Sequence, residues 1–211
     1  MCYTVFDKYR TVRHGFLTGR RSVERIMLMK LMIASDIHGS AKFCRELLSA
    51  FDMEGADKLL LLGDILYHGP RNDLPDGYAP KEVISLLRER HGKILSVRGN
   101  CEAEVDQMVL DFPVLADYAL IFVDGFELFA THGHIYNEAS LPPLGEGAVL
   151  LGGHTHVSKF VDHGSYFYAN PGSVSIPKEG TPRGYIIFED GTLVWKTLDG
   201  AEYMRHSVKK A

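Results

Sequence analysis

The sequence predicts an α/β fold in which two mixed β-sheets pack face to face with flanking helices, an α/β/β/α sandwich. In the first half, short apolar runs alternate with amphipathic segments, a pattern typical of parallel strands joined by crossover helices. In the second half, apolar runs follow one another, and Asp-Gly pairs at 124–125 and 190–191 are hairpin signals. These observations together indicate a single mixed domain.

The elements of the first half are read from apolar periodicity. Strands are expected where apolar runs are short, and helices where apolar residues recur at helical spacing. Ser40 stands where it can cap the first helix. The segment 67–80 is rich in Pro, Gly, Asn and Asp, which indicates a loop. In chain order, the predicted strands and helices are strand 31–35, helix 40–51, strand 58–62, helix 80–91 and strand 93–97.

The elements of the second half are almost all strands. Three successive aromatic residues, at 166–168, are expected to point to alternate faces of the strand 165–169. This favours a core or interface strand and leaves a homo-oligomer open. The predicted strands are 118–123, 127–131, 148–151, 158–161, 165–169, 184–188 and 192–197.

Composition limits the classes of partner and compartment. A net charge of −4 does not favour binding to extended nucleic acid, which needs a basic face. Apolar runs fall far short of the roughly 20 residues of a membrane span, so no membrane partner is expected. The three cysteines show no CxxC spacing, which favours a reducing, cytoplasmic location.

The first 28 residues differ from the rest. They hold six basic and two acidic residues, whereas residues 29–211 hold 17 basic against 25 acidic residues. A cleavable signal peptide would remove part of the predicted site and is rejected. We expect residues 1–28 to be an N-terminal extension that is disordered or arises from the choice of start codon, with a targeting arm as the alternative, and residues 29–211 to form one domain.

Polar segments follow the apolar runs and carry the predicted chemistry. Because ligand sites in open α/β sheets lie at the carboxyl ends of the strands, these segments are expected to converge. Carboxylate, imidazole and amide ligands without a thiolate pattern favour Mn²⁺, Fe²⁺, Zn²⁺, Mg²⁺ or Ni²⁺ over a structural zinc site. The D-x-H and H-x-H spacings are expected to place their two side chains on one side of an extended segment. The segments are Asp36-Ile37-His38, Gly63-Asp64, Gly99-Asn100-Cys101-Glu102, Thr131-His132-Gly133-His134 and Gly153-His154-Thr155-His156.

This ordered set of motifs resembles the calcineurin-like metallophosphoesterase superfamily, and its wider context resembles the YfcE-type phosphodiesterases within it. The resemblance runs from about residue 29 to about residue 198. It implies two divalent ions, Mn²⁺ first, with a bridging hydroxide as nucleophile. One ion is expected on Asp36, His38, Asp64 and His156, and the other on Asp64, Asn100, His132 and His154. Asp64, Asn100 and His132 are also assigned as catalytic.

One position departs from the wider superfamily. Many of its phosphomonoesterases and protein phosphatases have histidine after the motif asparagine, where it is read as a general acid, and this chain has Cys101. General acid help is typically worth about 10²–10⁴-fold. We therefore expect a phosphodiesterase acting on a small phosphodiester. A phosphomonoesterase of this fold and a catalytically silent scaffold remain the alternatives.

Several neighbouring residues have two open interpretations. Cys101 is expected to line the substrate pocket. Arg71 either binds a phosphate oxygen or is a solvated loop residue, and His134 either faces substrate or supports a ligand. Glu102 is expected to be a charge at a helix start. The turn 170–173 is expected to support the site without taking part in chemistry.

Overall fold

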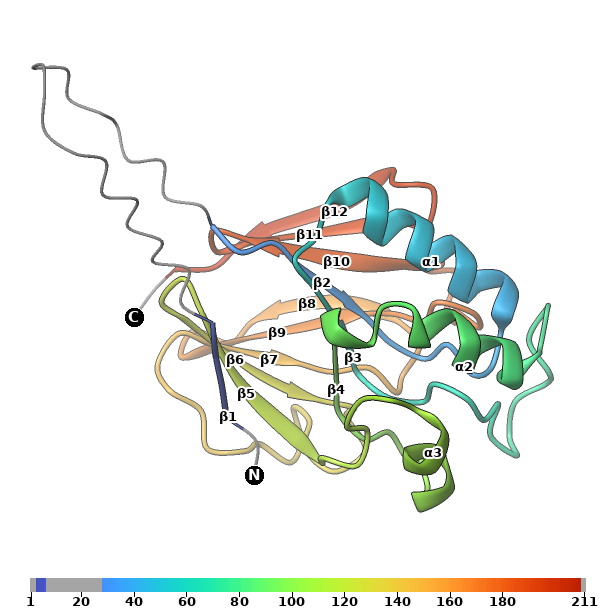
Figure 1. Cartoon of the computed structure of the whole chain (residues 1–211). Helices are drawn as coiled ribbons and strands as arrows, with labels where there is room; N and C mark the ends of the chain where they lie inside the picture. The colour runs from blue at the N-terminus through green and yellow to red at the C-terminus, as the bar shows by residue number, and fades with distance from the viewer. Residues whose placement is uncertain (1–2, 7–27, 210–211) are drawn as a thin grey trace, which may run out of the picture.

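The computed structural model describes residues 3–6 and 28–209. Strands in this part of the chain form two six-stranded sheets that lie face to face (Figure 1). The strand order is β1-β5-β6-β7-β9-β8 in sheet A and β12-β11-β10-β2-β3-β4 in sheet B. The predicted pair of mixed sheets is therefore confirmed.

Sheet B joins a parallel half to an antiparallel half. Strands β2, β3 and β4 run parallel, and β10, β11 and β12 are antiparallel neighbours. Strand β12 was not predicted, because its exposed edge carries charged and polar residues in place of an apolar run. The bounds are β2 (Leu31–Ala34), β3 (Lys58–Leu61), β4 (Ile94–Ser96), β10 (Gly184–Glu189), β11 (Thr192–Thr197) and β12 (Glu202–Ser207).

Sheet A contains a strand from the predicted N-terminal extension. Tyr3–Phe6, within this predicted extension, form β1, which pairs in parallel with β5. Residues 1–2 and 7–27 of the extension lie outside the described residues. The other bounds are β5 (Tyr118–Val123), β6 (Phe126–Thr131), β7 (Ala148–Leu151), β8 (Ser158–Asp162) and β9 (Tyr166–Pro171).

The helices begin and end at residues that suit those positions. Ser40 caps α1 (Ala41–Glu54) as predicted, accepting a hydrogen bond from the Phe43 N–H at 3.3 Å. Gly55, with φ 61°, ends the same helix in the left-handed conformation that favours glycine. The remaining helices are α2 (Pro80–Arg88), a 3₁₀ helix (His91–Lys93) and α3 (Glu104–Val109). Within 3–6 and 28–209, each helix is too short or too polar to cross a membrane.

Two apolar layers hold the domain together. The alternating side chains of each strand point to opposite faces, so one face of sheet B packs on α1 and α2 and the other packs on sheet A (Figure 1). Met32 and Leu59 belong to the helix-side layer, and Leu31 and Leu60 to the layer between the sheets. Trp195 lies fully buried between the sheets and donates from Nε1 to the Asn170 carbonyl at 2.7 Å.

The outer face of sheet A is covered differently. Phe129, Leu150 and Tyr168 form a smaller apolar cluster there, and Tyr136 and Leu144 from the connection between β6 and β7 pack against it. The helices that cover a sheet face, α1 and α2, thus lie on sheet B (Figure 1).

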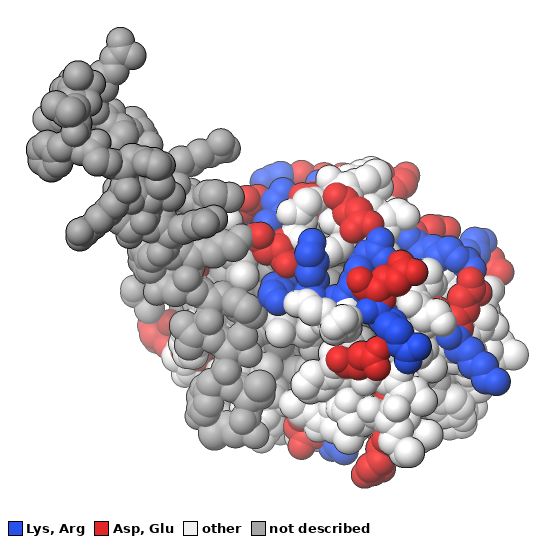
Figure 2. All heavy atoms as spheres, viewed as in Figure 1, with Lys and Arg blue, Asp and Glu red and all other residues white. Residues whose placement is uncertain are grey.

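Charged side chains of both signs alternate over α1 and α2 (Figure 2). Arg45 pairs with Glu82 across the two helices, and Arg90 pairs with Asp52 at 2.6 Å. Exposed pairs of this kind contribute little to stability, typically below about 1 kcal/mol. The face shown therefore presents mixed charge, not a basic stripe.

Candidate metal centre

The predicted ligands lie together where strands of both sheets end. Asp36 and His38 follow β2, Asp64 follows β3, and Asn100 follows β4 in sheet B. His132 follows β6, and His154 and His156 follow β7 in sheet A. Parallel strands bring their carboxyl ends to one edge, and the face-to-face packing brings the two edges together. All seven residues thus come from two sheets to one place.

Four of these residues form a first donor group, which we call group one: Asp36, His38, Asp64 and His156. The Nε2 atoms of His38 and His156 are 3.2 Å apart. Asp36 Oδ1 lies 3.4 Å from His38 Nε2 and 3.1 Å from His156 Nε2. All four side chains are almost fully buried. The ligand atoms of Asp36, His38 and His156 lie within 4.8 Å of one another, close enough to bind a single divalent cation.

The second donor group, group two, comprises Asp64, Asn100, His132 and His154. His132 Nε2 lies 3.1 Å from Asn100 Oδ1 and 3.2 Å from His154 Nδ1. Asp64 Oδ2 lies 3.5 Å from His132 Nε2 and 3.7 Å from His38 Nε2 of group one. One oxygen of Asp64 is thus placed between the two groups.

The other oxygen of Asp64 has a different partner. Asp64 was predicted to be a ligand of both ions. In the structure, Oδ1 accepts a hydrogen bond from the Cys101 N–H at 2.9 Å, and Oδ2 alone faces both groups. The backbone bond orients the carboxylate, so that Oδ2 is directed to the centre.

Three histidines are held in the tautomer that a metal ligand requires. The Nδ1 atoms of His38, His132 and His156 lie 2.7, 2.7 and 2.8 Å from the carbonyl oxygens of Tyr67, Leu62 and Ile176. A carbonyl only accepts, so Nδ1 carries a proton, and each ring in its neutral form presents an unprotonated Nε2. Two such nitrogens 3.2 Å apart cannot bond to each other, and Asp36 Oδ1 is buried without a hydrogen-bond partner. These atoms fit a bound cation.

The backbone at the ligands is unusual. The described residues include eight non-glycine positions with positive φ, and five of them are predicted ligands. The extended conformation expected for the D-x-H and H-x-H segments is therefore wrong, because the chain turns sharply as it leaves each strand. Such conformations persist only where surrounding structure holds them, and they cluster at functional sites. The five are Asp36 (φ 59°), His38 (φ 49°), Asp64 (φ 53°), His154 (φ 64°) and His156 (φ 62°).

The end of β9 and the turn after it hold these loops in place, as the sequence predicted for 170–173. The Asn170 amide donates to the Gly153 carbonyl at 2.8 Å and to Thr155 Oγ1 at 3.1 Å, on the turn that carries two ligands. Ser173 and Ser175 both donate to the Asp36 carbonyl, at 2.9 and 3.0 Å. The sequence signal for the serines was weak, because serine is common in turns.

Glu102 is not the helix-start charge that the sequence suggested. Helix α3 begins two residues later at Glu104, and the buried Glu102 carboxylate accepts hydrogen bonds from the N–H groups of Asp64, Ile65 and Gly99. A sequence contains no signal for such long-range contacts to the backbone.

The three predicted substrate-binding residues differ in position. Cys101 Sγ lies within 4.8 Å of ligand atoms of His38 and Asp64. The ring of His134 lies 5.4 Å from that of His132, and its Nδ1 is buried without a partner. Arg71 is exposed on the loop before α2. Among the described residues, it makes no hydrogen bond or ion pair with either donor group. Its role stays a prediction.

Opposite charges shift the titration of the metal-free cluster. Burial alone would raise the pKa of Asp36, but the imidazoles of His156 and His38 hold that pKa well below its usual range. Burial alone would lower the pKa of His132, but the hydrogen bond to Asp64 and the charges of Asp36 and Asp64 raise it to about 9. Burial and the neighbouring His132 and His154 lower the pKa of His134. The carboxylates of Asp36 and Asp64 therefore favour positive charge next to them.

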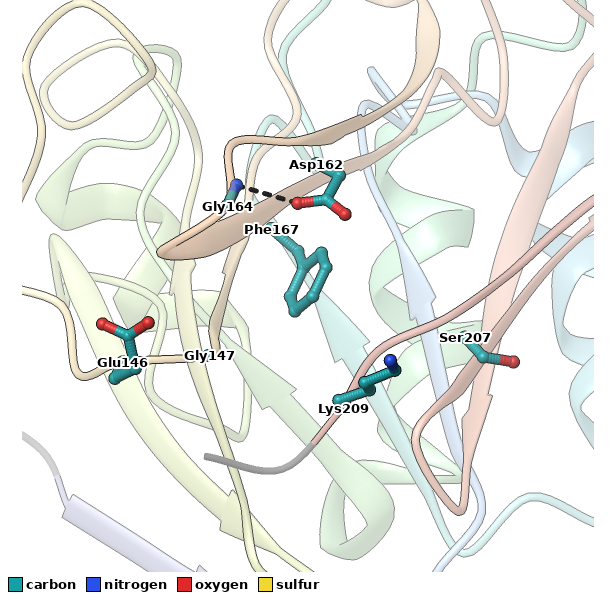
Figure 3. Close-up of a pocket in the computed structure, with 7 residues that line it drawn as sticks. All are labelled: Glu146, Gly147, Asp162, Gly164, Phe167, Ser207 and Lys209. Atoms are coloured by element: carbon teal, nitrogen blue, oxygen red, sulfur yellow. Dashed lines mark hydrogen bonds between the residues drawn. The ribbon is translucent and has the colours of Figure 1, made fainter.

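A pocket of about 320 Å³ lies elsewhere (Figure 3). Its wall includes Gly147, which precedes β7, whereas His154 follows the same strand. The pocket is therefore at the opposite end of β7 from the donor groups, and no predicted ligand lines it. The lining residues are Glu146, Gly147, Asp162, Gly164, Phe167, Ser207 and Lys209.

Residues 29–192 match the family model of the calcineurin-like phosphoesterase superfamily domain. The chain belongs to this superfamily. Membership confirms the predicted family and the enzyme class, a phosphoric ester hydrolase. The family match spans every predicted ligand.

Known proteins of the superfamily resemble this chain to different degrees. Phosphodiesterase YfcE from Escherichia coli strain K12 is 48% identical over 166 residues, which cover 79% of this chain and 90% of that protein. The solved structure of Yfce, a phosphoesterase from E. coli, superposes with a TM-score of 0.83 at 44% identity, over 86% of this chain and all of that chain. Wild-type Vps29 from Entamoeba histolytica, solved with Zn²⁺, has a TM-score of 0.56 at 19% identity over 85% of this chain and 99% of its own, and shows the shared fold alone.

Proposed function

We propose that this chain is a metal-dependent phosphodiesterase that hydrolyses a small phosphodiester with two divalent ions, Mn²⁺ first, held by donor groups one and two. The observation that carries the proposal is the position of Asp64 Oδ2, 3.7 Å from His38 Nε2 and 3.5 Å from His132 Nε2. A two-metal site needs a ligand shared between ions about 3.5–4 Å apart. The name of the E. coli relative supports the diester as substrate.

The residues of the chain have distinct parts in this chemistry. Bound divalent ions would supply a nucleophilic water at neutral pH and offset charge on the phosphoryl oxygens. Asp64 sets the spacing of the two groups, and Asn100 and His132 complete group two. His134 lies beside that group with an unpartnered Nδ1, where it can contact a substrate oxygen.

Cys101 supports a substrate whose leaving group can depart without a proton. It stands at the cluster where a histidine could protonate a leaving group, and a thiol is a weak acid in comparison. Leaving groups that need a proton are therefore expected to react slowly. Esters with acidic leaving groups, among them activated diesters, need less help.

The test compares an aryl phosphodiester with the matching monoester. The protein is stripped with chelator and assayed with Mn²⁺, with other divalent ions and without metal, beside Asp64→Asn and His154→Ala. We expect Mn²⁺ to restore a diester preference that both variants lose. A monoester preference would favour a phosphomonoesterase, and absence of metal binding would favour a silent scaffold.

We also propose that the protein acts in the cytoplasm and on a small substrate. The cysteine spacing supports a cytoplasmic location, and the acidic balance supports a small substrate over extended nucleic acid.

A further inference from the structure

Glu102 is a buried carboxylate beside the donor groups that the proposed chemistry does not use. Its side chain accepts three hydrogen bonds, all from backbone N–H groups. Oε2 accepts from Asp64 at 2.9 Å and from Gly99 at 2.5 Å, and Oε1 accepts from Ile65 at 2.7 Å. A charged side chain is rarely buried without partners, and here three backbone N–H groups donate to it.

Two of these N–H groups, those of Asp64 and Ile65, need this acceptor because of how the chain leaves β3. Gly63 and Asp64 both have positive φ, 93° and 53°, so the chain turns out of the strand direction. The carbonyl side of the turn is held by loop 36–39, whose His38 N–H donates to the Asp64 carbonyl at 2.9 Å. The N–H groups of Asp64 and Ile65 are buried, and buried backbone donors require acceptors. Glu102 supplies them.

Glu102 also ties this turn to the end of the next strand. Glu102 accepts a hydrogen bond from the N–H of Gly99, which precedes the predicted ligand Asn100. The Cys101 N–H, on the other side of Asn100, donates to Asp64 Oδ1. The contact is tight, because a Cβ added at Gly99 would lie 2.1 Å from Asp64 Oδ1 and 2.7 Å from Glu102 Oε2. One side chain thus fixes the spacing between Asp64 and the segment that carries Asn100.

We infer that Glu102 is a positioning residue that holds the shared Asp64 carboxylate in register with Asn100, so that one oxygen serves both donor groups. The inference rests on the proposed function and assigns a task to a residue that touches neither ion nor substrate. A purely structural Glu102 would affect folding alone. A positioning Glu102 sets metal affinity and turnover in a protein that remains folded.

The test replaces the carboxylate by an amide of the same shape. Glu102→Gln keeps the volume but turns an NH₂ group toward at least one backbone N–H. Glu104→Gln is the matched control, because it removes the same charge from an exposed residue two positions along. Free Mn²⁺ is measured by electron paramagnetic resonance during titration of the metal-free proteins, at a temperature where circular dichroism shows them folded, and kcat is measured at saturating Mn²⁺.

We expect Glu102→Gln to bind Mn²⁺ about 10- to 100-fold more weakly than wild type, the usual effect of removing a partner that orients ligands. We also expect its kcat to stay reduced at saturating Mn²⁺, with Glu104→Gln unchanged in both. A folded Glu102→Gln protein with wild-type affinity and kcat would overturn the inference. If that variant does not fold, Glu102→Asp, one methylene shorter, is judged by the same two outcomes. If the proposed function is wrong, the wild-type protein itself will bind no Mn²⁺ or cleave no diester. That result would overturn both the proposed function and the positioning role of Glu102.

Discussion

At the scale of single residues, the site depends on backbone conformations that side chains seldom adopt. Each left-handed non-glycine residue costs on the order of 1–3 kcal/mol, and five predicted ligands have that conformation. The neighbours that fix their peptide groups therefore matter as much as the ligands. Ser173, Ser175 and Glu102 are such neighbours, since they bond to the peptide groups of Asp36 and Asp64.

Ser173→Ala should destabilise the protein by about 1–3 kcal/mol, because buried groups lose their partner. The hydroxyl donates to the Asp36 carbonyl and accepts from the N–H groups of Ser175 and Ile176 at 3.2 and 3.0 Å. Urea unfolding of the metal-free protein measures the loss. The exposed Ser165→Ala serves as control, and a Ser173→Ala effect as small as that of the control would contradict the expectation.

Metal affinity should rise with pH until about pH 9. The pKa of His132 is raised to about 9 in the metal-free protein, so the ring holds a proton at pH 7.5 that a bound ion must displace. Above the raised pKa that competition ends. Calorimetric titration with Mn²⁺ in buffers of different ionisation enthalpy measures the released protons. We expect proton release at pH 7.5 that declines as the pH passes 9; equal heats in all buffers at pH 7.5 would contradict this.

At the scale of elements, α1 shows how a local signal translates into structure. Ser40 accepts from the Phe43 N–H and also donates to the Asp76 carbonyl at 2.6 Å, which joins the start of α1 to the loop between β3 and α2. The helix is then held by its buried face against sheet B.

Ser40→Ala should cost about 1–2 kcal/mol in the free energy of unfolding, because the loss of an N-cap alone costs about 0.5–2 kcal/mol. The comparison is with Ser85→Ala on the exposed face of α2, which should change stability by less than about 0.5 kcal/mol. Equal midpoints in urea for the two variants would show that the cap does not stabilise α1.

Sequence patterns predicted the elements that have a buried periodic face and missed two that do not. The strands after which the ligands stand are apolar runs, and α1 and α2 show helical spacing, so all were predicted within a few residues. Helix α3 has six residues and no buried one, and β12 lies at an exposed edge, so neither had a clear pattern. The predicted ligands followed from residue types at strand ends. Glu102 could not be assigned, because two of its three partners are 37 and 38 positions away in the chain.

At the scale of the whole molecule, the sandwich itself builds the site. Sheet B contributes Asp36, His38, Asp64 and Asn100, and sheet A contributes His132, His154 and His156. The apolar layer between the sheets, which includes the fully buried Trp195, sets the distance between the two edges. Each donor group draws ligands from both sheets, so that neither sheet alone can hold an ion as proposed.

The most direct measurement is a titration of the metal-free protein with Mn²⁺ while hydrolysis of an aryl phosphodiester is followed. Because Asp64 Oδ2 faces both donor groups, we expect both ions to be required for turnover. We expect activity to appear with the second equivalent and to level off at about two ions per chain. Activity that is complete at one equivalent, or that needs no metal, would contradict a shared two-metal centre.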